Sequence, residues 1–245
     1  FADDYRGIPQ DAAHLTLVEA GPVLFSMFKR DIRTYTEKAL AKRDVEVLLG
    51  EVVASVAPTR VTLRSGAALP AHTLVWGAGL QGNAILASLG VELQKGNRVG
   101  VGPDLRIPEH PEIFAVGDAA WITDSETDEV LPQLGSVALQ AGEHAGENIA
   151  RLLAGRQTNP FRYHDKGTMA TIGRASAVIQ LRRGRTIKGK AAALAWGTVH
   201  LALLSTGEDR AKAVVDWTWA GFTHERSARI SVPTSPTDDR PLARR

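Results

Sequence analysis

The chain has 245 residues, 44% hydrophobic and 23% charged, which is ordinary for a soluble globular protein that can bury a core. A formal net charge of +2 does not indicate nucleic-acid binding, and the absence of cysteine excludes disulfides, thiolate chemistry and cysteine-rich metal sites. The histidines form no pair at helical spacing and no serine–histidine–aspartate motif is present, so neither a metal site nor a protein nucleophile is predicted.

The N-terminal part of the chain predicts short strands around one helix. Residues 15–21 are expected to contain a strand, with the acid Glu19 at its end and Ala20 and Gly21 following. Residues 26–43 are expected to form a helix, because apolar residues recur there at helical spacing. Its buried stripe consists of Phe28, Ile32, Tyr35 and Ala39. Further short strands, which include a small antiparallel meander, are expected at residues 45–48, 52–56 and 61–63.

A glycine-rich stretch follows residues 73–76, which predict another buried strand. Residues 77–82 (Gly-Ala-Gly-Leu-Gln-Gly) formally match the GxGxxG pattern of dinucleotide-binding turns. A functional turn of this kind opens a βαβ unit with an acid about 20 residues further on. Gly96 and Asn97 predict a turn there instead, so we interpret the match as coincidental.

The stretch from Ile113 to Ala120 carries the most informative signal. Its first four residues are apolar, as in a parallel strand that is buried on both faces. Gly117 and Asp118 follow, which places the carboxylate at the carboxyl end of the strand, where open α/β sheets bind ligands. An acceptor there suits a ligand that carries hydroxyl groups. The alternative is that Asp118 only caps the next turn.

A second signal is a helix that is expected to begin near Ser136, a residue type favoured at the N-cap, and to end at Gly155. The helix N-terminus and Asp118 would then face the same pocket. Free N–H groups and the helix dipole favour anionic groups at such a terminus, such as a pyrophosphate or a reduced flavin.

These residues carry a resemblance to a known family. The Asp118 stretch resembles the second flavin-binding motif of flavoproteins with two dinucleotide-binding domains, in which the aspartate holds the ribityl chain of FAD. Residues 135–140 and 160–174 resemble the type II NADH dehydrogenases, the non-pumping NADH:quinone oxidoreductases, and especially the actinobacterial ones. The resemblance extends to about residue 230. It implies an α/β fold that is part of a glutathione-reductase-like flavoprotein, with a C-terminal helical membrane-docking region.

The resemblance also implies roles for particular residues. FAD would be held by Gly117, Asp118, Gly135, Ser136 and Val137. The co-substrate NADH would be held by Glu19, through its ribose hydroxyls, and by Ala78 and Gly79. The quinone would contact Gln140 and Lys166. The family has a glutamine where this chain has Ser136, which favours a rival acceptor. No protein residue is expected to be catalytic, because the flavin carries the chemistry.

The domain organisation follows from the same resemblance. Residues 1–84 would be the C-terminal part of an NADH-binding domain, residues 85–180 the C-terminal part of an FAD-binding domain, residues 181–232 a docking region and residues 233–245 a disordered tail. The chain begins at Phe1, and no credible glycine-rich phosphate-binding turn precedes Asp118. We therefore expect a C-terminal fragment that is inactive by itself.

The docking region is expected to lie on the cytoplasmic face of the cell membrane. Arg182, Arg183, Arg185, Lys188 and Lys190 form a basic run without an acid. Residues 191–204 form an apolar stretch that is too short to span a bilayer, and a second helix with an apolar stripe is expected at residues 211–222. A basic run beside such helices suits anionic lipid. The alternatives are two packed helices with a solvated loop, or RNA, for which no stacking platform is present.

Two rival functions stay open. One is a soluble oxidoreductase that uses FAD, NADH or NADPH, and another acceptor. The other is an inactive fragment that is membrane-associated or binds a partner. The sequence leaves the oligomeric state open, a homodimer included.

Overall fold

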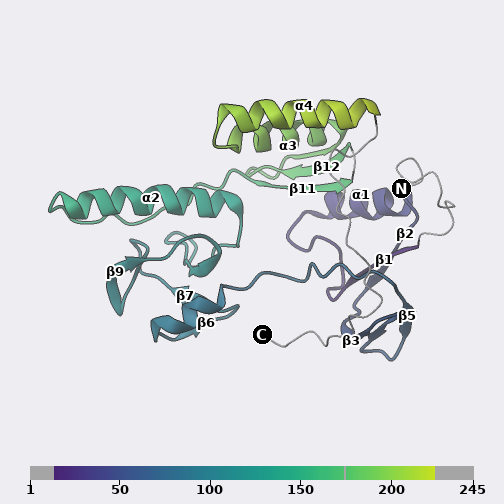
Figure 1. Cartoon of the computed structure of the whole chain (residues 1–245), viewed down its shortest axis with the longest axis horizontal. Helices are drawn as coiled ribbons and strands as arrows, with labels where there is room; N and C mark the ends of the chain where they lie inside the picture. The colour runs from purple at the N-terminus through teal and green to yellow at the C-terminus, as the bar shows by residue number, and fades with distance from the viewer. Residues whose placement is uncertain (1–13, 174, 224–245) are drawn as a thin grey trace, which may run out of the picture. The chain divides into compact units, whose positions relative to one another are not determined.

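A computed structural model describes residues 14–173 and 175–223, which fall into two units (Figure 1). Of the described residues, unit 1 combines 14–53 with 169–173, 175–180 and 186–223. Unit 2 comprises residues 54–168 and the short turn 181–185. The expected tail and residues 224–232 of the expected docking region lie outside the described residues. The expected domain boundaries stay a prediction.

Unit 1 begins with a β-α-β arrangement. Strand β1 (Leu15–Glu19) pairs in parallel with β2 (Val45–Leu49), in a register that places Glu19 opposite Leu49. Helix α1 (Arg30–Ala41) connects them. It begins four residues later than expected, because the preceding residues form a turn in which the Phe28 N–H donates to the Phe25 carbonyl at 2.8 Å.

The rest of unit 1 is a three-stranded sheet with helices on both faces. The strands β11 (Thr168–Gly173), β12 (Ser176–Gln180) and β13 (Thr186–Gly189) lie in that order. Helices α3 (Lys190–Leu203) and α4 (Gly207–Thr223) lie on one side of β11 and β12 and α1 on the other (Figure 1).

Strand β12 joins the two faces of this sheet, because successive side chains of a strand point in opposite directions. Val178 packs with Phe28 and Ile32 from the α1 side. Ala177 and Ile179 pack instead with Ala192 of α3. The expected stripe of α1 is therefore confirmed as core.

Unit 2 contains three small sheets and the longest helix. One sheet has the order β3 (Val53–Ala57), β4 (Arg60–Leu63), β5 (Ala68–Pro70), and β4 is antiparallel to β5. A second has the order β10 (Ala120–Trp121), β7 (Arg98–Gly100), β6 (Leu93–Gln94). The third pairs β8 (Arg106–Ile107) with β9 (His110–Phe114). The remaining elements are η2 (Ala84–Leu89), η3 (Gly117–Ala119) and α2 (Gly135–Leu153).

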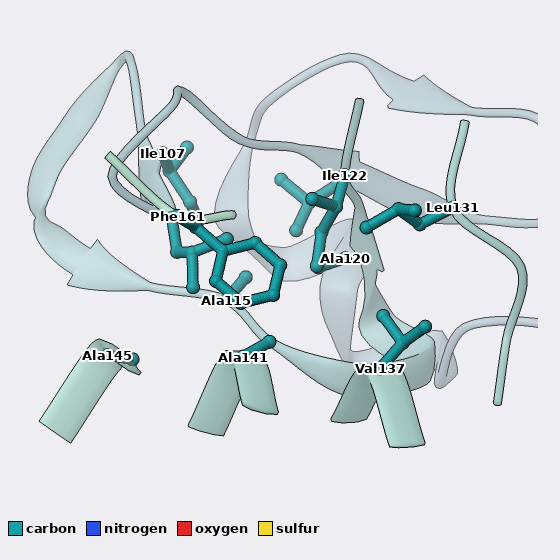
Figure 2. Packing of buried hydrophobic residues seen from close by; sticks show 11 residues of the cluster. Ile107, Ala115, Ala120, Ile122, Leu131, Val137, Ala141, Ala145 and Phe161 are labelled. Atoms are coloured by element: carbon teal, nitrogen blue, oxygen red, sulfur yellow. The ribbon is translucent and has the colours of Figure 1, made fainter. Parts of the chain in front are cut away.

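The core of unit 2 lies between one face of α2 and the segments around β9 and β10. Val137, Ala141 and Ala145 recur every fourth residue and point toward the strands (Figure 2). Small alanines on the helix let the backbone approach closely, and larger side chains fill the opposite side. The main ones are Ile107, Ile122, Leu131 and Phe161.

Two expected strands differ from the structure. Residues 73–76 form no strand, and Val75 and Trp76 are 87% and 63% exposed. A strand needs a neighbour to satisfy its backbone groups, and within residues 14–173 and 175–223 none pairs with this stretch. Strand β9 ends at Phe114 and pairs antiparallel with β8, so the expected parallel strand before Gly117 was wrong in its pairing.

The GxGxxG match also proves coincidental in structure. Residues 77–83 are irregular and lead into the short 3₁₀ helix η2 rather than into a long α-helix. Gly82 packs against the turn that Gly96 and Asn97 form between β6 and β7, since its N–H donates to the Gly96 carbonyl at 2.7 Å. A Cβ at Gly82 would collide with the Asn97 carbonyl.

Candidate functional site

The turn that carries Asp118 is built by an extended residue followed by a glycine. Val116 is extended, and Gly117 has φ +64°, which favours glycine. The chain therefore turns sharply into η3 and presents Asp118 at the surface. Among residues 14–173 and 175–223, nothing donates a hydrogen bond to the Asp118 carboxylate, although its backbone carbonyl accepts one from Gln133 Nε2 at 3.1 Å.

The turn lies against the first turn of α2. A Cβ built at Gly117 would lie 3.4 Å from the Ala138 Cβ, so the turn is in van der Waals contact with the helix. The expected cap at Ser136 was wrong. Leu134 is the N-cap residue, the helix begins at Gly135, and no side chain caps it. Because Ser136 lies inside the first turn, its hydroxyl is directed elsewhere.

The first-turn N–H groups differ in availability. The N–H groups of Val137 and Ala138 both donate to the Leu134 carbonyl at 3.0 Å. Those of Gly135 and Ser136 have no acceptor within the described part of the chain. A Cβ at Gly135 would meet nothing within 4 Å. Gly135 and Ser136 are thus open to a ligand, whereas the Val137 side chain belongs to the core.

A polar row along α2 holds the chain segment that returns beside it. Ser136 and Tyr163 share a hydrogen bond between their hydroxyls at 2.9 Å. Gln140 Nε2 donates to the His164 carbonyl at 3.1 Å, and its Oε1 accepts the His164 N–H at 3.0 Å. His144 Nε2 lies 2.9 Å from the Asn159 carbonyl. These α2 residues are spaced four apart, so they share one side of the helix.

Asn148 completes the row as a buried polar residue. It is fully buried, donates to the Asn159 carbonyl at 2.9 Å and accepts the Asn159 N–H at 2.8 Å. The apolar residues Ile149 and Leu152 of the same helix are 43% and 40% exposed. Sequence periodicity missed this because an asparagine that binds backbone on both sides can be buried like an apolar residue.

A second buried network lies at the far end of α2. Burial acts to raise the pKa of Asp104, but hydrogen bonds from Thr158 at 2.7 Å and Arg106 at 2.6 Å outweigh it and leave this pKa below its ordinary value. A hollow of about 530 Å³ lies nearby, lined by Arg106, Leu152, Gly155, Arg156, Gln157 and Thr158. Its lining contains none of the residues expected to bind a cofactor.

Lys166 is exposed, and it forms no ion pair with a described residue. The neighbouring Asp165 carboxylate accepts the Gly167 N–H at 2.7 Å, so it stabilises a local turn rather than pairing with Lys166.

The expected NADH residues lie in different units. Glu19 is in unit 1 at the end of β1, where its Oε1 accepts the Gly21 N–H at 2.7 Å. Ala78 and Gly79 are in unit 2 and exposed, and Gly79 has φ +92° in a tight turn. Each unit is described by itself, so the grouping of Glu19 with Ala78 and Gly79 stays a prediction.

Helices α3 and α4 pack on each other and leave many apolar side chains exposed. A Cβ at Gly197 of α3 would lie 3.5 Å from the Trp217 ring, so the helices approach closely. Leu194, Leu203 and Val215 are 75%, 59% and 65% exposed. Within the described residues no helix is both long and apolar enough to cross a bilayer.

The chain can be assigned to a protein family. The family model described as pyridine nucleotide-disulphide oxidoreductase matches residues 7–142, which is more than half of the chain, and the chain belongs to this family.

Curated relatives narrow the class. The chain is 35% identical over 190 residues to a type II NADH:quinone oxidoreductase of Staphylococcus epidermidis. The aligned region covers 76% of the chain and 47% of that protein. It is 30% identical over 251 residues to the type II NADH:quinone oxidoreductase Ndh of Mycobacterium tuberculosis, with 98% and 52% covered. The chain thus spans about half the length of these relatives.

A solved structure has a similar fold. NDH2 from Plasmodium falciparum in complex with NADH superposes with a TM-score of 0.77 at 16% identity, covering 86% of the chain and 59% of that protein. At this identity the likeness concerns the fold alone.

Proposed function

We propose that this protein transfers electrons from NADH through bound FAD to a membrane quinone, menaquinone or ubiquinone, without pumping protons. The observation that carries the proposal is the exposed Asp118 carboxylate, which accepts no hydrogen bond from a described residue and lies beside the open first turn of α2. The names of the curated relatives support the same activity.

The residues present fit the hydroxyl-bearing part of FAD. Asp118 would accept hydrogen bonds from ribityl hydroxyls, and Gly117 keeps the turn close to α2. The N–H groups of Gly135 and Ser136 would donate to the flavin, assisted by the helix dipole. Val137 would contribute packing beneath them. When bound, FAD accepts a hydride from NADH and passes on electrons, and the protein supplies position and electrostatics.

Glu19, Ala78 and Gly79 are proposed to hold NADH. The Glu19 Oε2 atom accepts no hydrogen bond from a described residue, so it could accept one from a ribose hydroxyl, while Oε1 is held by Gly21. Gly79 would let the backbone approach the nicotinamide side of the molecule.

Gln140 and Lys166 are proposed to contact the quinone. A side-chain amide offers two donors and two acceptor positions. Because His164 uses one of each, one N–H donor of Gln140 is left for a quinone carbonyl. Lys166, exposed and without an ion pair among the described residues, would contact the quinone from the solvent side.

The region from residue 181 to 232 is proposed to dock peripherally on the cytoplasmic face of the membrane. The exposed apolar residues of α3 and α4 and the basic run 182–190 support this, because apolar burial and attraction to anionic lipid add together. A homodimer is compatible with the proposal. The division into four parts that the sequence predicts is also part of this proposal.

A second candidate is a soluble oxidoreductase that passes electrons to oxygen, a dye or a protein. The specific observation in its favour is that Ser136, where the resembled family has glutamine, is occupied by Tyr163 rather than free for a quinone.

The test compares FAD content and NADH:menaquinone activity of the complete gene product with those of an Asp118→Ala variant. A Glu109→Ala variant, which changes an exposed acid between β8 and β9, is the matched control. We expect loss of FAD in the first variant only. FAD without quinone reduction would favour the second candidate, and absence of FAD from the wild type would overturn the enzyme assignment.

A further inference from the structure

Arg98 is a buried cation without a carboxylate beside it. Only 9% of the residue is exposed. Among residues 14–173 and 175–223, no acid lies within 4.0 Å of its guanidinium. Arginine is rarely buried unless it is paired, because an unpaired charge loses its hydration. The position therefore requires a physical explanation.

The partners of Arg98 are two backbone carbonyls and one ring. Its Nη1 atom lies 3.5 Å from the Ala120 carbonyl oxygen and 3.4 Å from that of Leu131. Both distances are long for N–H···O bonds. The guanidinium lies over the Trp121 ring, with its carbon 4.3 Å from the ring centroid. The other guanidinium nitrogens have no acceptor in the described part of the chain.

The two carbonyls belong to the two segments that form the candidate site. Ala120 follows Asp118 by two residues, and Leu131 precedes the N-cap of α2 by three. The same two segments are joined by the Gln133 side chain to the Asp118 carbonyl, and by the Leu131 N–H to the Ile122 carbonyl at 2.9 Å. Arg98 thus lies where the Asp118 turn is attached to the entrance of α2.

Charge acts in the same place. Burial lowers the pKa of Arg98, and the negative charge of Asp118 acts in the opposite direction. Among the described residues, no cation lies within 4.0 Å of the exposed Asp118 carboxylate. Arg98 is therefore near enough to Asp118 for the two charges to interact, although they form no ion pair.

We propose that Arg98 is a positioning residue for Asp118: its guanidinium holds the Asp118 turn against the segment that enters α2, and its charge offsets that of the carboxylate while the neutral, hydroxyl-bearing part of a ligand is bound. The role of FAD as that ligand rests on the proposed function. The attachment of the turn does not, so the two are tested separately.

The first experiment needs no cofactor. Amide hydrogen exchange is measured across residues 117–122 and 131–134 in the wild type, in Arg98→Met and in Arg98→Lys. The control is Arg106→Met, which removes an arginine paired with Asp104 in the same unit. We expect exchange in both segments to rise about tenfold in Arg98→Met alone, and less in Arg98→Lys, which keeps the charge. Unchanged exchange in Arg98→Met, or an equal rise in the control, would overturn the proposal.

The second experiment is a double-mutant cycle on FAD affinity of the complete gene product. Arg98→Met and Asp118→Asn are each expected to raise the dissociation constant of FAD about tenfold or more. If Arg98 acts through Asp118, the double variant is little weaker than Asp118→Asn alone. Effects that multiply would show general destabilisation and overturn the proposal. A wild type that binds no FAD would sink the proposed function, and the exchange experiment would still decide the role of Arg98.

Discussion

The side chain of Gln140 and the backbone of His164 form a two-way hydrogen-bonded pair, with Nε2 donating at 3.1 Å and Oε1 accepting at 3.0 Å. Gln140, the residue expected to bind quinone, therefore holds the segment that returns along α2. Its amide retains one donor and one acceptor for a ligand.

Gln140→Ala is accordingly predicted to affect both stability and quinone use. The substitution removes two hydrogen bonds and leaves the partly exposed N–H and carbonyl of His164 without this partner. We expect the free energy of unfolding to fall by about 1–2 kcal/mol. Chemical denaturation measures this cost, and Glu143→Ala, an exposed acid of the same helix, should change little. In the complete gene product the KM for quinone should rise while reduction of FAD by NADH is unchanged. An unaltered quinone KM would leave Gln140 a purely structural residue.

Gly117→Ala is predicted to destabilise unit 2. Gly117 has φ +64°, and the added methyl group would lie 3.4 Å from the Ala138 Cβ. The backbone conformation alone is expected to cost about 1–2 kcal/mol, and FAD affinity should fall with it. Gly142→Ala is the matched control, because this exposed glycine lies within α2 with nothing within 4 Å of an added Cβ. It should raise stability by about 0.5–1 kcal/mol. Thermal unfolding distinguishes the two, and equal shifts would contradict the argument.

Asp31 is predicted to make the stability of unit 1 depend on pH under acid conditions. Hydrogen bonds from Lys188 at 2.8 Å and Thr186 at 2.7 Å lower the pKa of Asp31 to about 2 from 3.8. Because the folded-state pKa lies below the unfolded-state value, the contribution is complete above pH 3.8 and is lost as the pH falls through about 2. The Tm of Asp31→Asn should be lower than that of the wild type near pH 6, and the two should converge toward pH 2. A constant difference would show that the carboxylate charge is not involved.

The exposed apolar residues of α3 and α4 are predicted to bind lipid. Replacing Leu194, Leu203 and Val215 together by serine should reduce co-sedimentation with vesicles that contain anionic lipid, because about 0.8 kcal/mol is lost for each CH₂ no longer buried. Unfolding free energies should change little, since these side chains are already solvated. Leu153→Ser, which alters an 85% exposed leucine of α2, is the control. Undiminished binding of the triple variant would contradict membrane docking by these helices.

Several local elements could be predicted from the sequence because their patterns are short-range. The stripe of α1, the strands β3 and β4 and the turn between β6 and β7 each depend on residues close together in the chain. The turn at Gly117 was recognisable for the same reason, since only a few residue types accept positive φ. The Asp118 carboxylate could thus be assigned to a turn from sequence alone.

Contacts between distant segments could not be predicted. Ser136 is a residue type favoured at an N-cap, but α2 begins one residue earlier, at Gly135. The Ser136 hydroxyl instead binds Tyr163, 27 residues away. Residues 73–76 have the composition of a buried strand, yet they are exposed, because composition does not state whether a neighbouring strand is present. Arg98 gave no signal at all, since an arginine in a short strand is usually solvated.

By itself, the sequence determined the residue types at each position and hence the local turns, the helical stripes and the family. Only the tertiary structure decided which polar groups are already bonded and which are left for a ligand. Gln140 and Asp118 differ in this respect. The Gln140 amide binds the backbone of His164, 24 residues away, whereas the Asp118 carboxylate accepts no hydrogen bond from a described residue. The reason is physical: a hydrogen bond depends on distance and direction in space, and segments far apart in the chain acquire these only when the core brings them together.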